Sequence, residues 1–431
     1  MISFLHNRDF IYFFKKGLID IKRCSRIVSV FITVLILLSS VLTSVYAAVP
    51  ETASEAAVLI DAKSKSVLYE KNSNEKLAPA STTKIMTLLL AAEYGKLDEK
   101  VTVNTSLLKD LPSDATIAYF QQGEITTVKD LFMAVYLISA NDAAIILANH
   151  IGQSVDGFVN MMNERAKKLG CDSTTFVNPT GLNDENQLTT VSDMAKMAEA
   201  LYENQTARPL FSTLSYTVAA SPTRAQSFEM SLKNDLMTKT SESYYPSVTF
   251  GKTGYTDASK YTIAAIAQKD DTTLVSVSFC AASKQDMYGD VRKMLDYGFG
   301  DFYKLTISKT ELEALFSGKR NEEIKVKDDI KLLIPSSVKR ENLIKSVETS
   351  DGAAFVSVKG DGYNYSKKIA DVVTKKGPSG FFGAILWFIK LIFKIIFYII
   401  IIFVFLYLLL TIYVNIKKKN KKKKNNVRVK R

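Results

Sequence analysis

Residues 395–414 constrain the architecture of this chain more than any other stretch, because they form an apolar run of twenty residues without a charge. A helix rises 1.5 Å per residue, so such a run spans the roughly 30 Å of hydrocarbon in a bilayer. Residues 417–431 then carry 10 basic groups and no acidic ones. Because basic segments stay on the cytoplasmic side, we predict a transmembrane helix at 395–416 and a cytoplasmic tail at 417–431.

A second apolar run, residues 27–44, comes after a basic leader near the start of the chain. Val45-Tyr46 and then the small residues Ala47 and Ala48 come after it, and these suit cleavage by signal peptidase near Ala47. Residues 1–48 are therefore predicted to be a signal peptide or an uncleaved N-terminal anchor. Either interpretation exports the central part of the chain, so we expect a protein of the cytoplasmic membrane with its globular part on the outer face.

The net charge of +12 raises the question of a nucleic-acid partner. The basic surplus is concentrated in the leader and the tail, and the region between them is mildly acidic. Basic groups at the two ends of a chain are typical of a membrane-topology signal and not of a nucleic-acid-binding surface. No nucleic-acid partner is therefore expected. The C-terminal helix makes membrane lipid a predicted partner.

The central region begins and ends with strand patterns and has helical patterns between them. Hairpins are predicted at 56–62 with 67–70 and at 260–268 with 272–282. The first predicted helix begins after Pro79 and ends at Gly95, and further helical patterns occupy 127–138, 142–151 and 188–203. This order predicts an α+β fold in which the early hairpin joins the late strands in one antiparallel sheet covered by helices.

The pattern changes after residue 305 to short alternating runs separated by polar turns. We predict a small all-β domain at 305–372, to which the runs 323–327, 330–335 and 354–360 contribute strands. Residues 373–394 are predicted to be a linker whose apolar second half lies along the membrane interface.

Three short motifs in the central region carry chemistry: Ser81-Thr82-Thr83-Lys84, Ser139-Ala140-Asn141 and Lys252-Thr253-Gly254. Ser81 follows Pro79-Ala80 at the start of an apolar helix, and Lys84 lies one turn away on the same face. A serine hydroxyl is a poor nucleophile until a base removes its proton. Lys84 can be that base only when neutral, and burial together with a second cation would lower its pKa from about 10.4.

The other two motifs offer groups that bind and relay protons. Asn141 provides a donor and an acceptor for a peptide bond, and Ser139 can relay a proton. Lys252 is the candidate second cation, on an extended segment that could pair with a peptide substrate as an edge strand. Gly254 would let that substrate approach closely.

The chain resembles a known enzyme family through these motifs and the longer strings around them. The strings are PASTTKIMT (79–87), ISANDAA (138–144), FVNPTGLNDEN (176–186), SDMAKMA (192–198) and GKTGYT (251–256). They are similar to those of the low-molecular-mass D-alanyl-D-alanine carboxypeptidases, in the serine β-lactamase and penicillin-binding superfamily. The resemblance implies a β-lactamase/transpeptidase-like catalytic domain at 53–303, and the β domain and anchor also match the layout of that family.

The resemblance implies a reaction and a role for each matching residue. Ser81 would attack the penultimate D-alanine of a peptidoglycan stem peptide, Lys84 would accept its proton, and Ser139 would pass a proton to the leaving D-alanine. Asn141 would hold the substrate amide; the remaining substrate-binding residues are Lys252, Thr253, Gly254 and Tyr255. The N–H groups of Ser81 and Tyr255 would form the oxyanion hole. Water would release the acyl-enzyme, β-lactam antibiotics would be covalent inhibitors, and no cofactor or metal is implied.

The sequence departs from the family pattern at three places. Gln187 stands where a histidine is common, and Met287 stands where an arginine often helps to hold the carboxylate, with Arg292 as a possible replacement. Phe250-Gly251 precedes Lys252, where glycine would be expected before the apolar residue. These departures bear on full activity and leave the nucleophile unchanged.

Four alternative functions can be compared with the residues present. A serine–histidine–aspartate hydrolase is disfavoured because His150 is the one exported histidine and ends an apolar helix. A β-lactamase would need a deacylating glutamate, where this chain has Pro179. A transpeptidase or endopeptidase acting on the same substrate, or a non-catalytic wall-binding scaffold, stays open.

Overall fold

The computed structural model describes residues 49–318, 322–374 and 381–428. The predicted leader, 1–48, and most of the predicted linker before residue 381 lie outside the described residues. The chain divides into two compact units: residues up to Thr306 together with Lys331–Glu341 form the first, and Ile307–Ile330 with the residues from Asn342 onward form the second.

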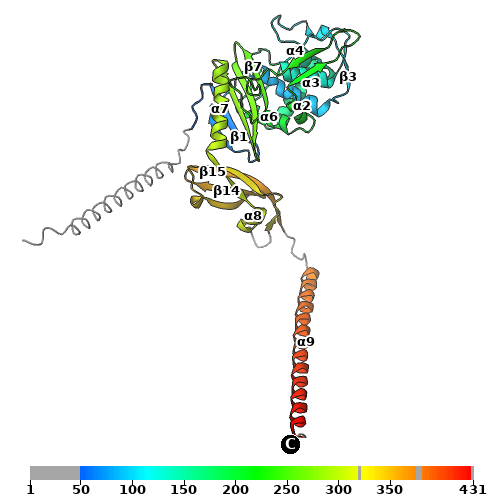
Figure 1. Cartoon of the computed structure of the whole chain (residues 1–431), viewed down its shortest axis with the longest axis vertical. Helices are drawn as coiled ribbons and strands as arrows, with labels where there is room; N and C mark the ends of the chain where they lie inside the picture. Colours follow the sequence, from blue (N-terminus) through cyan, green and yellow to red (C-terminus); the bar gives the residue numbers. More distant parts are fainter. Residues whose placement is uncertain (1–48, 319–321, 375–380, 429–431) are drawn as a thin grey trace, which may run out of the picture. The chain divides into compact units, whose positions relative to one another are not determined.

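The first unit is built on a five-stranded antiparallel sheet (Figure 1) with the order β2-β1-β9-β8-β7. Its strands are β1 (Ala56–Asp61), β2 (Val67–Lys71), β7 (Val248–Thr256), β8 (Lys260–Lys269) and β9 (Thr272–Ala281). Both predicted hairpins are confirmed, and the early one joins the late strands because β1 pairs with β9. The unbroken buried runs in β8 and β9 show that the sheet is covered on both faces.

Helices cover the two faces unequally. One face packs against α7 (Lys284–Gly300), and the other packs against a larger helical layer. That layer consists of α2 (Lys84–Tyr94), α3 (Val128–Ile138), α4 (Asn141–Gly152), α5 (Val155–Lys168) and α6 (Val191–Glu203). Alternation along β1 links the two cores, since Val58 packs into the larger cluster and Leu59 into the cluster under α7.

The helix ends follow local capping chemistry. Thr190 accepts a hydrogen bond from the N–H of Asp193, so the helix predicted at 188–203 begins at Val191. Gly95 ends α2 as predicted, but its backbone is extended and not left-handed. A side chain there would place its Cβ 2.7 Å from the carbonyl oxygen of Ala91, so close packing explains this glycine.

The second unit contains a four-stranded sheet with the order β11-β15-β14-β13. Its strands are β11 (Glu322–Ile324), β13 (Ile344–Ser350), β14 (Ala353–Gly360) and β15 (Tyr363–Thr374), with the short helix α8 (Lys309–Leu315) before them. The β character predicted for this part of the chain is present. The prediction that the run 330–335 is a strand of the small β domain is corrected here. The run forms β12 (Ile330–Pro335), which pairs with β10 (Phe302–Ile307). Leu333 packs into the cluster under α7, so Lys331–Glu341 belongs to the first unit.

The C-terminal helix α9 (Phe381–Arg428) is continuous. Its stretch Ile385–Val414 is, in the described part of the chain, the one helix long and apolar enough to cross a membrane, and its apolar side chains are exposed. This candidate span begins earlier than the predicted 395. It therefore includes much of the segment expected to lie along the interface.

Asp290 on α7 ties the start of the first strand to the helix behind it. Its buried carboxylate accepts the N–H of Ala53 (2.9 Å), the N–H of Ser54 (2.7 Å) and the hydroxyl of Ser54 (2.6 Å). We predict that Asp290→Ala lowers the free energy of unfolding by about 2–4 kcal/mol, because it leaves the buried N–H of Ser54 without its acceptor and removes two further hydrogen bonds. Chemical denaturation measures this loss. The control, Asp296→Ala, removes an exposed carboxylate from the same helix. Equal losses in the two variants would contradict the assignment.

Candidate active site

Ser81 lies on a strained turn between the sheet and the first long helix. It belongs to the 3₁₀ helix Ala80–Thr83, which leads directly into α2. Ala80 has a φ of 47°, a left-handed conformation that costs free energy for a residue with a side chain. The hydroxyl of Thr262 on β8 donates to the carbonyl of Pro79 (3.1 Å) and holds the turn against the sheet. Local sequence and tertiary packing together fix the position of Ser81.

Lys84 is fully buried, and its amine contacts three oxygen atoms. Its Nζ lies 2.9 Å from the hydroxyl of Ser81, 2.8 Å from Oδ1 of Asn141 and 2.6 Å from the carbonyl oxygen of Thr180. The amide and carbonyl oxygens can only accept hydrogen bonds. A neutral amine has two hydrogens for them and one lone pair, which is left for the proton of Ser81.

The surroundings of Lys84 favour that neutral form. Burial lowers its pKa well below the ordinary value, the charge of Lys252 lowers it further, and the carboxylate of Asp142 opposes the shift. The amine can therefore lose its proton far more readily than a surface lysine. The spacing of Ser81 and Lys84 thus places the amine within hydrogen-bond distance of the hydroxyl, and their roles as nucleophile and base stay a prediction.

Lys252 and Ser139 form the second contact pair of the site. The Nζ of Lys252 donates to the hydroxyl of Ser139 (2.9 Å) and to the carbonyl of Thr253 (2.9 Å). Burial lowers the pKa of Lys252 to about 7. Ser139 adopts a left-handed φ of 61° where α3 ends, and this turn directs its hydroxyl toward β7.

Asn141 is held in one orientation by its neighbours. Its Nδ2 donates to the carbonyl of Thr116 (3.0 Å), so its Oδ1 faces Lys84. The adjacent Asp142 is fully buried and accepts the N–H of Ala118 (2.9 Å).

Thr116, Asp142 and Thr180 complete the site, although the sequence did not single them out. Asp142 and Thr180 lie in the strings that resemble the family, and nothing local marks Thr116.

The third motif forms the outer edge of the sheet. β7 pairs only with β8 among the described strands, so its other edge is free to pair with a peptide. A Cβ on Gly254 would lie 2.6 Å from the backbone nitrogen of Ser81, which shows how closely this strand approaches the nucleophile. Thr253 and Tyr255 flank this contact. The Tyr255 side chain is half exposed.

Two of the three departures from the family pattern have packing explanations. Gln187 is buried, and its Oε1 accepts the N–H groups of Val177 and Asn178 (both 2.9 Å), so a neutral amide holds the loop that carries Thr180. The glycine at 251 leaves room for Asn234, whose Nδ2 would lie 2.1 Å from a Cβ there.

Met287 and Arg292, which concern the third departure, lie outside the site. Met287 is buried in the cluster under α7, and Arg292 donates to the backbone carbonyl of Glu242 (3.0 Å). The idea that Arg292 replaces the missing arginine therefore gains no support from this structure.

His150 and Pro179 bear on the two alternative enzymes, a serine–histidine–aspartate hydrolase and a β-lactamase. The Nε2 of His150 lies 3.3 Å from a carboxylate oxygen of Glu99, and this contact gives the histidine a structural partner. Pro179 presents its carbonyl to the hydroxyl of Thr87 (2.7 Å). The position that would carry a deacylating glutamate thus contributes a backbone oxygen. Cys171 and Cys280 are free thiols.

The D-alanyl-D-alanine carboxypeptidase family model (peptidase S11) matches residues 43–283, which span the five-stranded sheet, the larger helical layer and all three motifs. The chain belongs to this family. A D-alanyl-D-alanine carboxypeptidase of Bacillus subtilis, DacF, is 33% identical over 315 residues, covering 71% of this chain and 79% of the relative. DacC of Escherichia coli is 31% identical, covering 61% of this chain and 65% of that protein.

Solved structures of the family share the fold. Penicillin-binding protein 5 of Haemophilus influenzae aligns with a TM-score of 0.62 at 23% identity, covering 76% of this chain and 99% of that one. The Streptomyces K15 DD-transpeptidase aligns at 0.55 and 26% identity, covering 59% and 99%. The carboxypeptidase fold predicted from the motifs, an antiparallel sheet with helices, is thereby confirmed.

The contact between Gly254 and the nucleophile turn predicts a steric requirement. Gly254→Ala would press a methyl group against the nitrogen of Ser81 and displace the turn, so we expect acylation by benzylpenicillin to slow by about 100-fold or more. Stopped-flow kinetics would measure the rate. The matched control is Gly289→Ala, where a Cβ meets nothing within 4 Å. Comparable rates in both variants would refute the requirement.

The charge coupling between the two lysines predicts a shift in pH dependence. Acylation should rise with pH as Lys84 becomes neutral. The charge of Lys252 lowers the pKa of Lys84, so Lys252→Ala should raise that pKa and move the rise to higher pH. The pH profile of benzylpenicillin acylation measures the midpoint. Lys71→Ala, on the opposite edge strand, is the control and should leave the midpoint in place. A midpoint that stays or falls in Lys252→Ala would disprove the coupling.

Proposed function

We propose that this carboxypeptidase uses Ser81 to cleave the terminal D-alanine from peptidoglycan stem peptides through an acyl-enzyme. The observation that carries the proposal is the contact set of Lys84. Two of its three neighbouring oxygens can only accept hydrogen bonds, which leaves the lone pair of the neutral amine for the Ser81 proton.

The proposed first half-reaction forms an ester. The oxygen of Ser81 bonds to the carbonyl carbon of the penultimate D-alanine while its proton passes to Lys84. The resulting oxyanion accepts hydrogen bonds from the N–H groups of Ser81 and Tyr255, a device worth about 3–4 kcal/mol per donor. The C–N bond then breaks, and Ser139, whose hydroxyl contacts the amine of Lys252, passes a proton to the leaving amine.

In the proposed binding mode, the substrate lies along β7. Lys252 and Thr253 bind its terminal carboxylate, and Gly254 permits the close approach. Asn141 has one N–H of its amide engaged with Thr116, so the second remains to hold the substrate amide. Water attacks the ester in the second half-reaction, releasing the shortened peptide and restoring Ser81.

The proposed location is the outer face of the cytoplasmic membrane. The candidate span Ile385–Val414 supports a membrane anchor, and the basic residues after it support a cytoplasmic end for α9. The catalytic unit then faces the wall, where its stem-peptide substrate lies and where β-lactam antibiotics reach it.

The test uses benzylpenicillin and the intact mass of the protein. The full chain in detergent should gain a lasting adduct of one penicillin, and Ser81→Ala should gain none. Rapid loss of the adduct would instead indicate β-lactamase turnover. A folded protein that forms no adduct would contradict the proposal and favour the non-catalytic scaffold.

Release of D-alanine from a pentapeptide separates hydrolysis from transfer. We expect free D-alanine and a shortened acid as the dominant products, even when an amine acceptor is present. A cross-linked product in excess of the acid would indicate a transpeptidase with the same first half-reaction.

A further inference from the structure

A loop segment, Thr116–Phe120, lies directly against the catalytic residues. The carbonyl of Thr116 accepts both the backbone N–H of Asn141 (2.8 Å) and its Nδ2 (3.0 Å). The buried carboxylate of Asp142 accepts the N–H groups of Ala118 (2.9 Å) and Phe120 (3.3 Å). Two consecutive residues, Asn141 and Asp142, therefore fix the backbone of this segment.

The segment exposes one aromatic side chain between two buried neighbours. Ala118 and Phe120 are 5% and 4% exposed, whereas Tyr119 is 75% exposed. Tyr119 also has a left-handed φ of 59°, which is costly for a large side chain. This turn directs the N–H groups of Ala118 and Phe120 toward Asp142, so the protein fixes a strained loop whose tip is an exposed ring. Strain and exposure of this kind are found at ligand-contacting positions.

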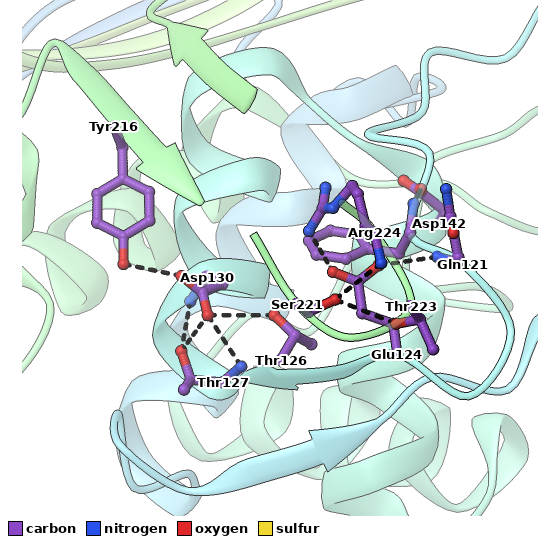
Figure 2. Close-up of polar contacts among 11 residues, drawn as sticks. Gln121, Glu124, Thr126, Thr127, Asp130, Asp142, Tyr216, Ser221, Thr223 and Arg224 are labelled. Carbon is purple, nitrogen blue, oxygen red and sulfur yellow. Dashed lines mark hydrogen bonds and ion pairs between the residues drawn. The ribbon is translucent and has the colours of Figure 1, made fainter. Parts of the chain in front are cut away.

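A buried ion pair holds the far end of the same loop. Figure 2 shows the guanidinium of Arg224 beside the carboxylate of Glu124, with the second carboxylate oxygen accepting the N–H of Gln121 (3.0 Å). The carboxylate is 1% exposed and the arginine side chain 11%. Arg224 also lies over the rings of Phe228 (4.0 Å) and Phe120 (5.6 Å). The pair therefore packs directly on the residue after Tyr119.

The hairpin that carries Arg224 is itself fixed. Arg224 and Ser221 exchange backbone hydrogen bonds in the turn between β5 (Ser215–Val218) and β6 (Phe228–Ser231). At the other end of the hairpin, the hydroxyl of Tyr216 donates to Asp130 at the start of α3 (2.8 Å; Figure 2). The hairpin that carries Arg224 is thus fixed at both ends, and Arg224 in turn holds the loop in place.

We propose that Tyr119 is a specificity-determining residue that contacts the stem peptide on the N-terminal side of its D-Ala–D-Ala end, and that the Glu124–Arg224 pair positions it. This inference rests on the proposed function. A peptide paired with β7 passes Ser81, and a chain of hydrogen bonds leads from Ser81 through Lys84 and Asn141 to Thr116. The 116–120 segment therefore borders the candidate site on the side of Asn141. The ring of Tyr119 would bury apolar side-chain surface of the peptide that the D-alanines do not supply.

The first test compares two peptides that share the same reacting end. One is a pentapeptide with a diamino acid before D-Ala–D-Ala, and the other is N-acetyl-glycyl-D-alanyl-D-alanine. We expect Tyr119→Ala to lower the ratio of kcat/KM for the long peptide over the short one by about tenfold, mainly through KM, because the ring binds ground and transition states alike. Tyr119→Phe should keep the ratio. Tyr94→Ala, which removes another exposed tyrosine, is the matched control.

A second variant excludes misfolding as the cause. Tyr119→Gly removes the ring and also relieves the left-handed strain, so its melting temperature should not fall while the long-to-short ratio still does. An unchanged ratio in either the alanine or the glycine variant would overturn the role of Tyr119.

A double-mutant cycle tests the positioning role of the ion pair. If Arg224 acts through Tyr119, Arg224→Met should also lower the ratio, and the double variant should lose no more than Tyr119→Ala alone. Arg165→Met removes a comparable arginine–glutamate pair elsewhere and should leave the ratio unchanged. Additive losses would overturn the positioning role.

The outcomes also separate this inference from the proposed function. Ser81→Ala should abolish turnover of both peptides and the penicillin adduct, whereas Tyr119→Ala should retain the adduct and turn over both peptides. A Ser81→Ala variant that still releases D-alanine would sink the proposed function, and with it this inference.

Discussion

The burial of one amine between fixed oxygen atoms determines how the rest of this site is built. Lys84 has no solvent to hydrate its charge, and the oxygens of Asn141 and Thr180 consume two of its hydrogens. A buried lysine in such surroundings releases its proton more readily, which suits it to remove the proton of Ser81. Asn141 and Thr180 supply two of these oxygens. Thr116 holds Asn141 in place, and Gln187 holds the loop that carries Thr180.

The supporting elements come from distant parts of the chain and carry local strain. Ala80, Tyr119 and Ser139 all have left-handed backbones, and each adjoins the site. Such conformations persist only where the surroundings fix them. Asp142 supplies that restraint for the loop at 116–120, and the sheet supplies it for the turn before Ser81 through Thr262. The family fold therefore serves as a rigid frame for backbone geometry that the isolated segments would not keep.

Much of the site could be predicted from sequence because its chemistry is local. Ser81 and Lys84 are one helical turn apart, so their contact follows from spacing alone. The remaining motif residues came from the resemblance to the carboxypeptidase family, and their roles stay predictions. By contrast, Met287 stands where the family often has a carboxylate-binding arginine but lies in the core under α7, because a motif pattern does not show which face of a helix a residue occupies. The strand at 330–335 was assigned to the wrong unit for a similar reason, since strand pairing joins residues irrespective of their order in the chain.

The sequence by itself determined the strand–helix–strand order, the apolar segment before the basic tail and the three motifs, because these depend on periodicity, length and local spacing. Tertiary structure decided the rest. It brought Thr180 to the amine of Lys84, placed Thr116 beside Asn141 and paired Arg224 with Glu124, contacts that join residues separated by long stretches of chain. A buried carbonyl or carboxylate acquires its role only from the partners that packing brings to it, and no local pattern records those partners.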